Sequence, residues 1–383
     1  MNGFDLRPIR SLVVTRQRSA NQRVNSEIWN LNLDQIEPHT GRVLSKVYID
    51  SSKLGPSTYL FAPKTVLYSK LRPYLNKVIV AYESGAATTE LVPLICKESE
   101  VIPEYLAYFL RSNKFLTFAS NVVSGAKMPR MVMSEFWNYK APIPSIPEQR
   151  RIVAILDQAK ALLEKRQQSL AQVDGLEQAI FYAMFGDPIK NSMRWPLRRL
   201  GEVGTLDRGV SKHRPRNAPE LLGGPYPLIQ TGDIANCDGY IRSYQSTYTD
   251  FGLKQSKLWP AGTLCITIAA NIAKTGILTF AACFPDSVVG FRSGQQSTIE
   301  YVRVLLSFMQ KRLEDFAPES AQKNINLAIL RALDIPFPPI KRQETFARYI
   351  NELGKLKASY RSSLTELDAL FASLQHRAFR GEL

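Results

Sequence analysis

The chain has 383 residues, of which 45% are hydrophobic, so it is long enough for two domains that each bury a core. Its formal net charge of +15 favours an acidic polymer or an anionic surface as partner, and nucleic acid is the leading candidate. No apolar run is long enough for a membrane span or resembles an export signal, so we expect a cytoplasmic protein. The four cysteines show no metal-ligand spacing, which indicates reduced thiols and no disulfide framework.

Residues 1–143 are predicted to form a first globular domain of mixed structure. The run at 65–69 is rich in β-formers and reads as a buried strand, and residues 103–109 read as a short amphipathic helix. Phosphate contacts need Arg and Lys, and base edges are read by Arg, Lys, Asn and Gln. The candidate DNA-binding residues of this domain are Arg16, Arg18, Arg23, Lys70, Arg72, Lys77, Lys127 and Arg130.

Residues 144–188 are predicted to form a long helix. Pro142 and Pro144 precede it, Ser145 is placed to cap it, and Glu148 follows three residues later. Alternating steps of four and three residues then give a coiled-coil seam, which ends near Gly186. The seam positions are Ile152, Leu156, Ala159, Leu163, Arg166, Leu170, Val173, Glu177, Ile180 and Met184.

Residues 189–337 repeat the signals of the first domain. The apolar run at 263–267 corresponds to 65–69, and Tyr301 corresponds to Tyr105 at an offset of 196 residues. Residues 1–140 and 191–334 carry net charges of +7 and +5, so both halves are basic. The candidate DNA-binding residues of the second domain are Arg208, Lys212, Arg214, Arg216, Gln230, Asn271, Lys274, Lys323, Asn324 and Asn326.

Residues 338–383 are predicted to form a second long helix. Pro142, Pro144, Ile146 and Gln149 recur 194 residues later, and the seam recurs at the same offset, from Phe346 to Ala378. We therefore predict an α+β protein with two mixed α/β domains related by an internal repeat and joined by two long antiparallel coiled-coil helices. In the alternative interpretation, each helix packs only on its own domain.

The sequence favours binding over catalysis. It contains no phosphate-binding loop, no HExxH zinc motif and no methyl-donor loop with an Asn/Asp-Pro-Pro-aromatic motif. Its three histidines are His39, His213 and His376, so few residues are candidates for acid–base catalysis near neutral pH. We predict that the chain is not an enzyme and holds neither a metal nor a cofactor, although a duplicated enzyme with one decayed site would show a similar repeat.

Several segments resemble the specificity subunits of type I restriction-modification systems. They include the segment from Pro144 to Gln149, the helix ending Phe185-Gly-Asp-Pro188, and the ending Ala378-Phe-Arg-Gly-Glu-Leu383. The segments 67–77 and 195–202 are also similar to this family. The second helix start departs from the pattern, because Lys341 and Arg342 replace the Pro-Glu of the first.

The resemblance implies that each domain is a target-recognition domain for one half of a split double-stranded DNA site. The helices would set the unread gap and dock two methyltransferase subunits, and restriction subunits would join them. S-adenosylmethionine, ATP and Mg²⁺ would bind to those partners. The alternatives are the recognition subunit of a related modification or phage-exclusion complex, and a basic scaffold that binds proteins.

Overall fold

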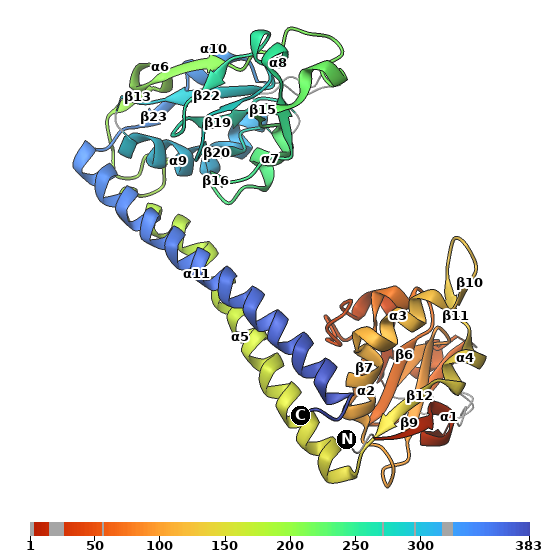
Figure 1. The fold of residues 1–383 in the computed structure, drawn as a ribbon. Coiled ribbons are helices and arrows are strands. Elements are labelled where there is room, and N and C mark those ends of the chain that lie inside the picture. The colour runs from red at the N-terminus through yellow and green to blue at the C-terminus, as the bar shows by residue number, and fades with distance from the viewer. Residues whose placement is uncertain (1–3, 15–26, 56, 270–271, 295, 316–324) are drawn as a thin grey trace. The chain divides into compact units, whose positions relative to one another are not determined.

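The chain divides into two compact units (Figure 1). The first contains residues 1–168 and 362–383, and the second contains residues 169–361. Two long helices, α5 (Ile146–Phe185) and α11 (Ile340–Ala378), contribute one part to each unit. The structure is a computed structural model that describes residues 4–14, 27–55, 57–269, 272–294, 296–315 and 325–383.

The first unit is built on two four-stranded sheets, in the orders β2-β9-β6-β7 and β4-β3-β8-β5. Short antiparallel pairs join β1 to β12 and β10 to β11. Helix α2 packs on the first sheet, where Tyr105 and Phe109 share a buried cluster with Val66 and Leu94. The strands are β1 (Asp5–Pro8), β2 (Val13–Val14), β3 (Glu27–Leu31), β4 (Tyr48–Asp50), β5 (Thr58–Phe61), β6 (Thr65–Ser69), β7 (Val78–Ala81), β8 (Gly85–Thr88), β9 (Leu91–Cys96), β10 (Val123–Ser124), β11 (Arg130–Met131) and β12 (Lys140–Ile143). The helices are α1 (Ile9–Leu12), α2 (Pro103–Arg111), α3 (Asn113–Asn121) and α4 (Met133–Asn138).

The second unit has a five-stranded sheet, β14-β22-β19-β20-β16, and a four-stranded sheet, β17-β15-β21-β18. Strand β13 pairs with β23, and helix α9 packs on the five-stranded sheet through a core that includes Tyr301, Leu305, Leu264 and Ile266. The strands are β13 (Leu197–Arg199), β14 (Thr205–Arg208), β15 (Leu222–Leu228), β16 (Tyr240–Ile241), β17 (Ser246–Tyr248), β18 (Leu258–Trp259), β19 (Leu264–Thr267), β20 (Thr275–Leu278), β21 (Ala282–Cys283), β22 (Val288–Arg292) and β23 (Asp334–Pro336). The helices are α6 (Leu200–Val203), α7 (Thr231–Asn236), α8 (Asp250–Lys254), α9 (Gln296–Asp315) and α10 (Leu327–Arg331).

The predicted α+β class is confirmed in both units. Strands β6 and β19 lie where the apolar runs at 65–69 and 263–267 predicted them, and every residue of both strands is buried. Such runs lack polar alternation because sheets cover them on one face and helices on the other. The central strand of each unit is therefore readable from sequence.

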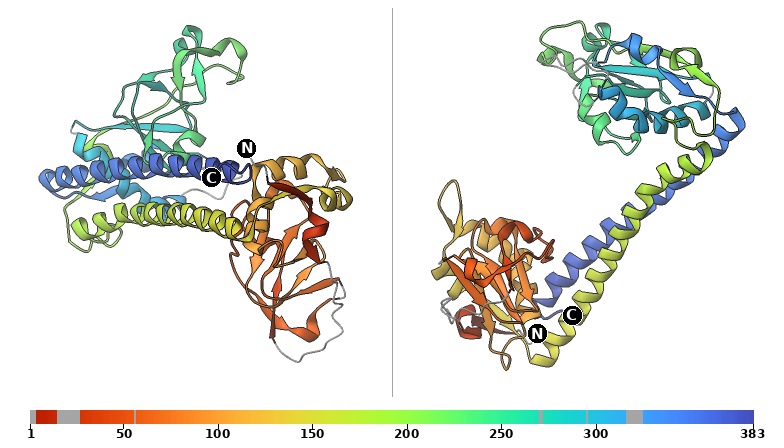
Figure 2. Two further views of the ribbon diagram at one scale, coloured as in Figure 1. Left: turned by 60° about the horizontal axis from the view of Figure 1, so that its bottom comes forward. Right: turned by 180° about the vertical axis from the view of Figure 1, so that it is seen from behind.

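Within each unit, α5 and α11 lie side by side with opposite directions (Figure 2). In the first unit, Ile152 and Leu156 near the start of α5 share a core with Ala378 at the end of α11. In the second unit, the rings of Phe181 and Phe346 have centroids 5.6 Å apart. The ten predicted seam positions of each helix are buried or half-buried, and most of the residues between them are exposed.

Two charged residues of the predicted seam form ion pairs in the second unit, each with one buried member, Arg303 in one case and Lys357 in the other. Glu177 of α5 lies 2.5 Å from the guanidinium of Arg303 on α9. Lys357 of α11 lies 3.0 Å from Asp174 and 3.5 Å from Asp238. These side chains therefore join the helices to each other and to the globular part of the unit.

The start of each long helix is held by the same two contacts. The Tyr105 hydroxyl donates to the Pro142 carbonyl, and the Tyr301 hydroxyl donates to the Pro336 carbonyl, both at 2.7 Å. Gln149 donates to the Pro144 carbonyl at 2.9 Å, and Gln343 makes the same 2.9 Å bond to the carbonyl of Pro338.

The spacing of Ser145 and Glu148 predicts a helix cap in which the Glu148 carboxylate bonds back to Ser145, but no hydrogen bond joins these two residues in the described part of the chain. The Glu148 carboxylate pairs with Arg151 at 3.0 Å on the same helix. The neighbouring Gln149 is fully buried, donates also to the Glu100 carbonyl and accepts from the Ile102 amide, both at 2.9 Å. The helix start is thus tied to the domain by a glutamine whose role the repeat alone did not indicate.

Among the described residues, no helix is both long enough and apolar enough to cross a membrane. The four cysteines are free thiols, of which Cys265 and Cys283 are buried. Burial raises the pKa of the half-buried Cys96 thiol to about 12, which leaves it protonated and unreactive near neutral pH.

Candidate nucleic-acid interface

Three segments of the first unit are tied together where strand β6 ends. The Lys70 amide donates to the Glu90 carbonyl at 2.9 Å, and the Met131 amide donates to the Lys70 carbonyl at 2.8 Å. The Arg72 amide donates to the Pro129 carbonyl at 2.7 Å. These bonds gather four of the predicted DNA-binding residues, which we call the basic ridge: Lys70, Arg72, Lys127 and Arg130.

The hairpin of β10 and β11 (Figure 1) carries two residues of the basic ridge, Lys127 and Arg130. Ser124 lies opposite Arg130 in the register, and Gly125 turns the chain with a φ of +88° that favours glycine. Lys127 at the tip is exposed, and the side chain of Met128 is 45% exposed. A cation and an apolar side chain are thus both presented to solvent at the tip.

Arg130 is held by a carboxylate from the neighbouring loop. Its Nε lies 3.0 Å and 3.2 Å from the two carboxylate oxygens of Glu90, and its Nη2 lies 2.9 Å from Oε1. The arginine side chain is nevertheless 44% exposed. The hydrogen bond to Glu90 raises the pKa of Arg130 above its ordinary value, so the group is a permanent and oriented cation.

The other cations of the first unit differ in how they are held. Among the described residues, Lys70, Arg72 and Lys127 have no ion-pair partner within 4.0 Å. Lys77, also a candidate, instead donates from Nζ to the Leu33 carbonyl at 2.5 Å, and burial lowers its pKa. Lys77 therefore supports the fold beneath the loops and does not join the basic ridge.

The second unit uses the same framework at the end of its central strand. The Ile325 amide donates to the Ile268 carbonyl at 3.0 Å, which corresponds to the bond between Met131 and Lys70. Two candidates lie beside it. The Lys274 amide donates to the Thr267 hydroxyl at 3.0 Å, and Asn326 caps α10 by accepting from the Ile329 amide at 2.8 Å.

The remaining described candidates of the second unit follow strand β14. Arg208 ends the strand, and Lys212 is exposed on the loop beyond it. Asp286 lies 2.6 Å from Nη2 of Arg216 and 3.9 Å from Nη2 of Arg214. Gln230 is the N-cap residue of α7 and lines a cavity of about 290 Å³ together with Arg216. Arg214, Arg216 and Gln230 therefore form a second cluster within the unit.

Six predicted DNA-binding residues lie outside the described residues. They are Arg16, Arg18, Arg23, Asn271, Lys323 and Asn324.

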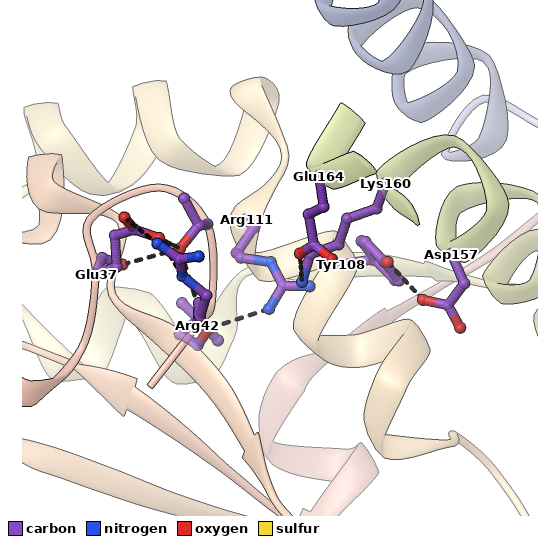
Figure 3. Close-up of polar contacts among 9 residues, drawn as sticks. Glu37, Arg42, Tyr108, Arg111, Asp157, Lys160 and Glu164 are labelled. Carbon is purple, nitrogen blue, oxygen red and sulfur yellow. Dashed lines mark hydrogen bonds and ion pairs between the residues drawn. The ribbon is translucent and has the colours of Figure 1, made fainter. Parts of the chain in front are cut away.

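Sequence reasoning missed a polar cavity of about 320 Å³ between α2, α5, α11 and the loop after β3. Figure 3 shows the polar contacts of several residues that line it. Arg111 donates to the Val78 carbonyl at 3.0 Å, and Tyr108 donates to Asp157 at 2.6 Å. Burial, followed by repulsion from Arg111, lowers the pKa of Lys160. The partners come from segments far apart in sequence, so no local motif signals them.

Arg111 needs a glycine beside it. Gly41 has a φ of +69°, and a β-carbon there would lie 2.3 Å from Nη1 of Arg111. Gly239 of the second unit has a φ of +75°, and a β-carbon there would lie 2.6 Å from Nη1 of Arg303. In both units, a turn glycine gives space to a guanidinium from the main domain helix.

Comparison with known proteins decides the family. The family of type I restriction modification DNA specificity domains matches residues 44–173 and 193–367, which together make up most of the chain. The chain belongs to this family. The type I restriction-modification specificity subunit predicted from sequence is confirmed, and with it a role in DNA recognition by a subunit that is not itself the catalyst.

Relatives within the specificity family are distant. The EcoDI specificity subunit of Escherichia coli is 29% identical over 156 residues, which cover 40% of this chain and 34% of that protein. The StySPI specificity subunit of Salmonella potsdam is 21% identical over 88% of this chain and 81% of that protein.

One solved structure is similar to this chain in fold. It comes from work on complex assembly and conformational transition of the type I restriction-modification system, and its TM-score is 0.69 at 18% identity. The match covers 100% of this chain and 99% of that one. This likeness shows that the two chains share a fold.

Proposed function

We propose that each unit reads one half of a split double-stranded DNA target, through target-recognition domains at 1–143 and 189–337. The observation that carries this proposal is the shared backbone bond after the central strand, from Met131 to Lys70 and from Ile325 to Ile268. Candidate basic or amide side chains lie beside this bond in both units, namely Lys70 and Arg130 in the first and Lys274 and Asn326 in the second. This supports two reading domains with a common framework and different side chains.

The helical segments at 144–188 and 338–383 are proposed to form an antiparallel coiled coil that sets the unread gap. The buried seam positions and the internal repeat at an offset of 194 residues support this role. A 40-residue helix is about 60 Å long at 1.5 Å per residue, whereas DNA rises about 3.4 Å per base pair. A helix of that length spans about 18 base pairs, so it could hold two reading domains between one and two turns of DNA apart.

Catalysis is proposed to lie in partner proteins. The relatives are specificity subunits of type I restriction enzymes, and the solved chain comes from a study of complex assembly. We infer that two methyltransferase subunits and the restriction subunits join this chain, with S-adenosylmethionine, ATP and Mg²⁺ bound to them. The assembly would act in the cytoplasm, where it meets DNA.

Selection from a random duplex library tests the function. The purified chain, with its modification subunits, is expected to enrich two short motifs separated by a fixed unread gap. Enrichment of no motif would contradict DNA specificity. A salt titration separates the basic scaffold from this proposal, because phosphate contacts make log K fall steeply with log salt whereas a protein partner need not.

A further inference from the structure

We propose that Arg130 reads a guanine in the half-site of the first unit and that Glu90 is the residue that positions it. This inference rests on the proposed function. It separates the basic ridge into one base-reading side chain and a surrounding set of phosphate contacts.

The hydrogen bonds to Glu90 leave the Nη1–Nη2 edge of the Arg130 guanidinium free. A guanidinium carries five N–H groups, and Glu90 takes the Nε hydrogen and one Nη2 hydrogen. Nη1 and the second hydrogen of Nη2 point away from the carboxylate and have no partner among the described residues. These two nitrogens form the end-on fork that matches guanine O6 and N7, the commonest specific contact in the major groove.

Glu90 restrains Arg130 before DNA arrives. Fixing a long side chain on binding costs conformational entropy, and a guanidinium already held in place avoids part of that loss. The Glu90 backbone is itself held, because its carbonyl accepts from the Lys70 amide at 2.9 Å. Glu90 and Met131, the residue after Arg130, are therefore both held by the backbone hydrogen bonds of Lys70, just after strand β6.

The same pair makes Arg130 a poor phosphate anchor. Glu90 neutralises the arginine at close range, so the pair attracts a phosphate backbone less than a free cation does. The neighbours Lys70, Arg72 and Lys127 have no such carboxylate among the described residues, and Arg72 and Lys127 are exposed. These three suit phosphate contacts, whereas Arg130 suits a base edge.

The chain offers a matched control in the same unit. Arg42 pairs with Glu37 by two hydrogen bonds of 2.9 Å, from Nε and from Nη2, so its chemistry is nearly that of the Arg130 pair (Figure 3). Arg42 lines the cavity against α5 and α11 and does not belong to the basic ridge. Arg42→Lys therefore removes an equivalent guanidinium away from the proposed reading edge.

The test compares motifs enriched from a random duplex library by the wild-type chain, Arg130→Lys and Arg42→Lys, each with its modification subunits. Lysine keeps the charge but loses the fork, so Arg130→Lys is expected to lower the preference for one guanine of one half-site by about tenfold to a hundredfold. The other positions and the second half-site should keep their preferences. Arg42→Lys should reproduce the wild-type motif.

Glu90→Gln supplies a readout with the opposite sign. Removing the carboxylate frees a cation, so binding to random duplex DNA should strengthen and its salt dependence should steepen by up to about one phosphate contact. The guanine preference should weaken because Arg130 is no longer fixed. A merely structural role for Glu90 would weaken both kinds of binding together.

The outcomes are distinct. If the wild-type chain enriches a motif and Arg130→Lys enriches the same motif, or weakens binding to all sequences equally with an unchanged melting temperature, the assignment of Arg130 is overturned and the proposed function stands. If the wild-type chain enriches no motif, both are overturned.

Discussion

Backbone carbonyls at the start of each long helix are held by buried tyrosine and glutamine side chains. Tyr105 and Tyr301 are fully buried, and each donates its hydroxyl to a proline carbonyl that no water reaches easily. A buried carbonyl that loses its donor costs free energy, because nothing replaces the bond. These tyrosines therefore fix the angle at which the chain enters each helix.

Replacing either tyrosine by phenylalanine tests this role. Tyr105→Phe and Tyr301→Phe should each lower the free energy of unfolding by about 1–2 kcal/mol, measured by urea denaturation. Tyr82→Phe is the control, because Tyr82 is 70% exposed and its loss should change the free energy of unfolding by less than about 0.5 kcal/mol. Equal effects of all three changes would show that the buried bonds are not special.

Residue type alone predicted basic candidates for DNA binding but could not show which partner each candidate has in the fold. Lys77 and Arg130 look alike in sequence as basic residues near loops, yet Lys77 binds the Leu33 carbonyl and Arg130 binds Glu90. Leu33 lies 44 residues from Lys77, and Glu90 lies 40 residues from Arg130. Such contacts depend on the fold of the sheets, which no local pattern in the sequence specifies.

At the scale of elements, the long helices are the most predictable part of the chain. Their seam repeats every seven residues, so burial follows from the period alone, and the burial pattern agrees along both helices. The strands are short, from two to seven residues, and most were not predicted. A strand of two residues has too few side chains to show alternation.

Lys357 gives a prediction at this scale. Its side chain is 7% exposed and its ammonium lies between Asp174 and Asp238, so Lys357→Ala leaves two carboxylates without their shared cation. The free energy of unfolding should fall by about 2 kcal/mol, less than for a fully buried pair because both carboxylates reach solvent. Lys355→Ala, on the same helix but 74% exposed, should change it by less than about 0.5 kcal/mol.

The effect of Lys357→Ala should depend on pH. Burial alone would raise the pKa of Asp238, but ion pairs with Arg361 and Lys357 outweigh it and hold this pKa below its ordinary value. The contribution of the pair is therefore complete above the ordinary carboxyl pKa of about 3.9 and is lost as pH falls through the lower folded value. Urea denaturation between pH 3 and pH 7, as an approximate range, should show the difference between variant and wild type shrinking in acid. A constant difference would exclude Asp238 as the partner that matters.

At the scale of the whole molecule, the proposed function relates the length of the two long helices to the length of the unread gap in the DNA target. Both helices pass from one unit to the other along the chain, α5 after Gln168 and α11 after Arg361. A change at those two places alters the helical segments and leaves the residues of each reading surface untouched.

Inserting one heptad at each of these places should lengthen the unread gap by about three base pairs, because seven residues add about 10.5 Å. Both half-site motifs should persist in a random duplex selection. A heptad in only one helix is the control, since it leaves the seams unequal in length and should abolish selection of a bipartite motif. An unchanged gap after the double insertion would exclude the spacer role.

The hydrogen bonds that hold each domain to its long helix do not depend on the side chains of the residues that accept them. Tyr105, Tyr301, Gln149 and Gln343 all donate to main-chain carbonyls, which every residue possesses. Mutations in the surrounding loops can therefore change which bases are preferred without removing the acceptors of these bonds. If each unit reads its own half-site, as proposed, a domain can change the bases it prefers while the hydrogen bonds that hold it to its helix are kept.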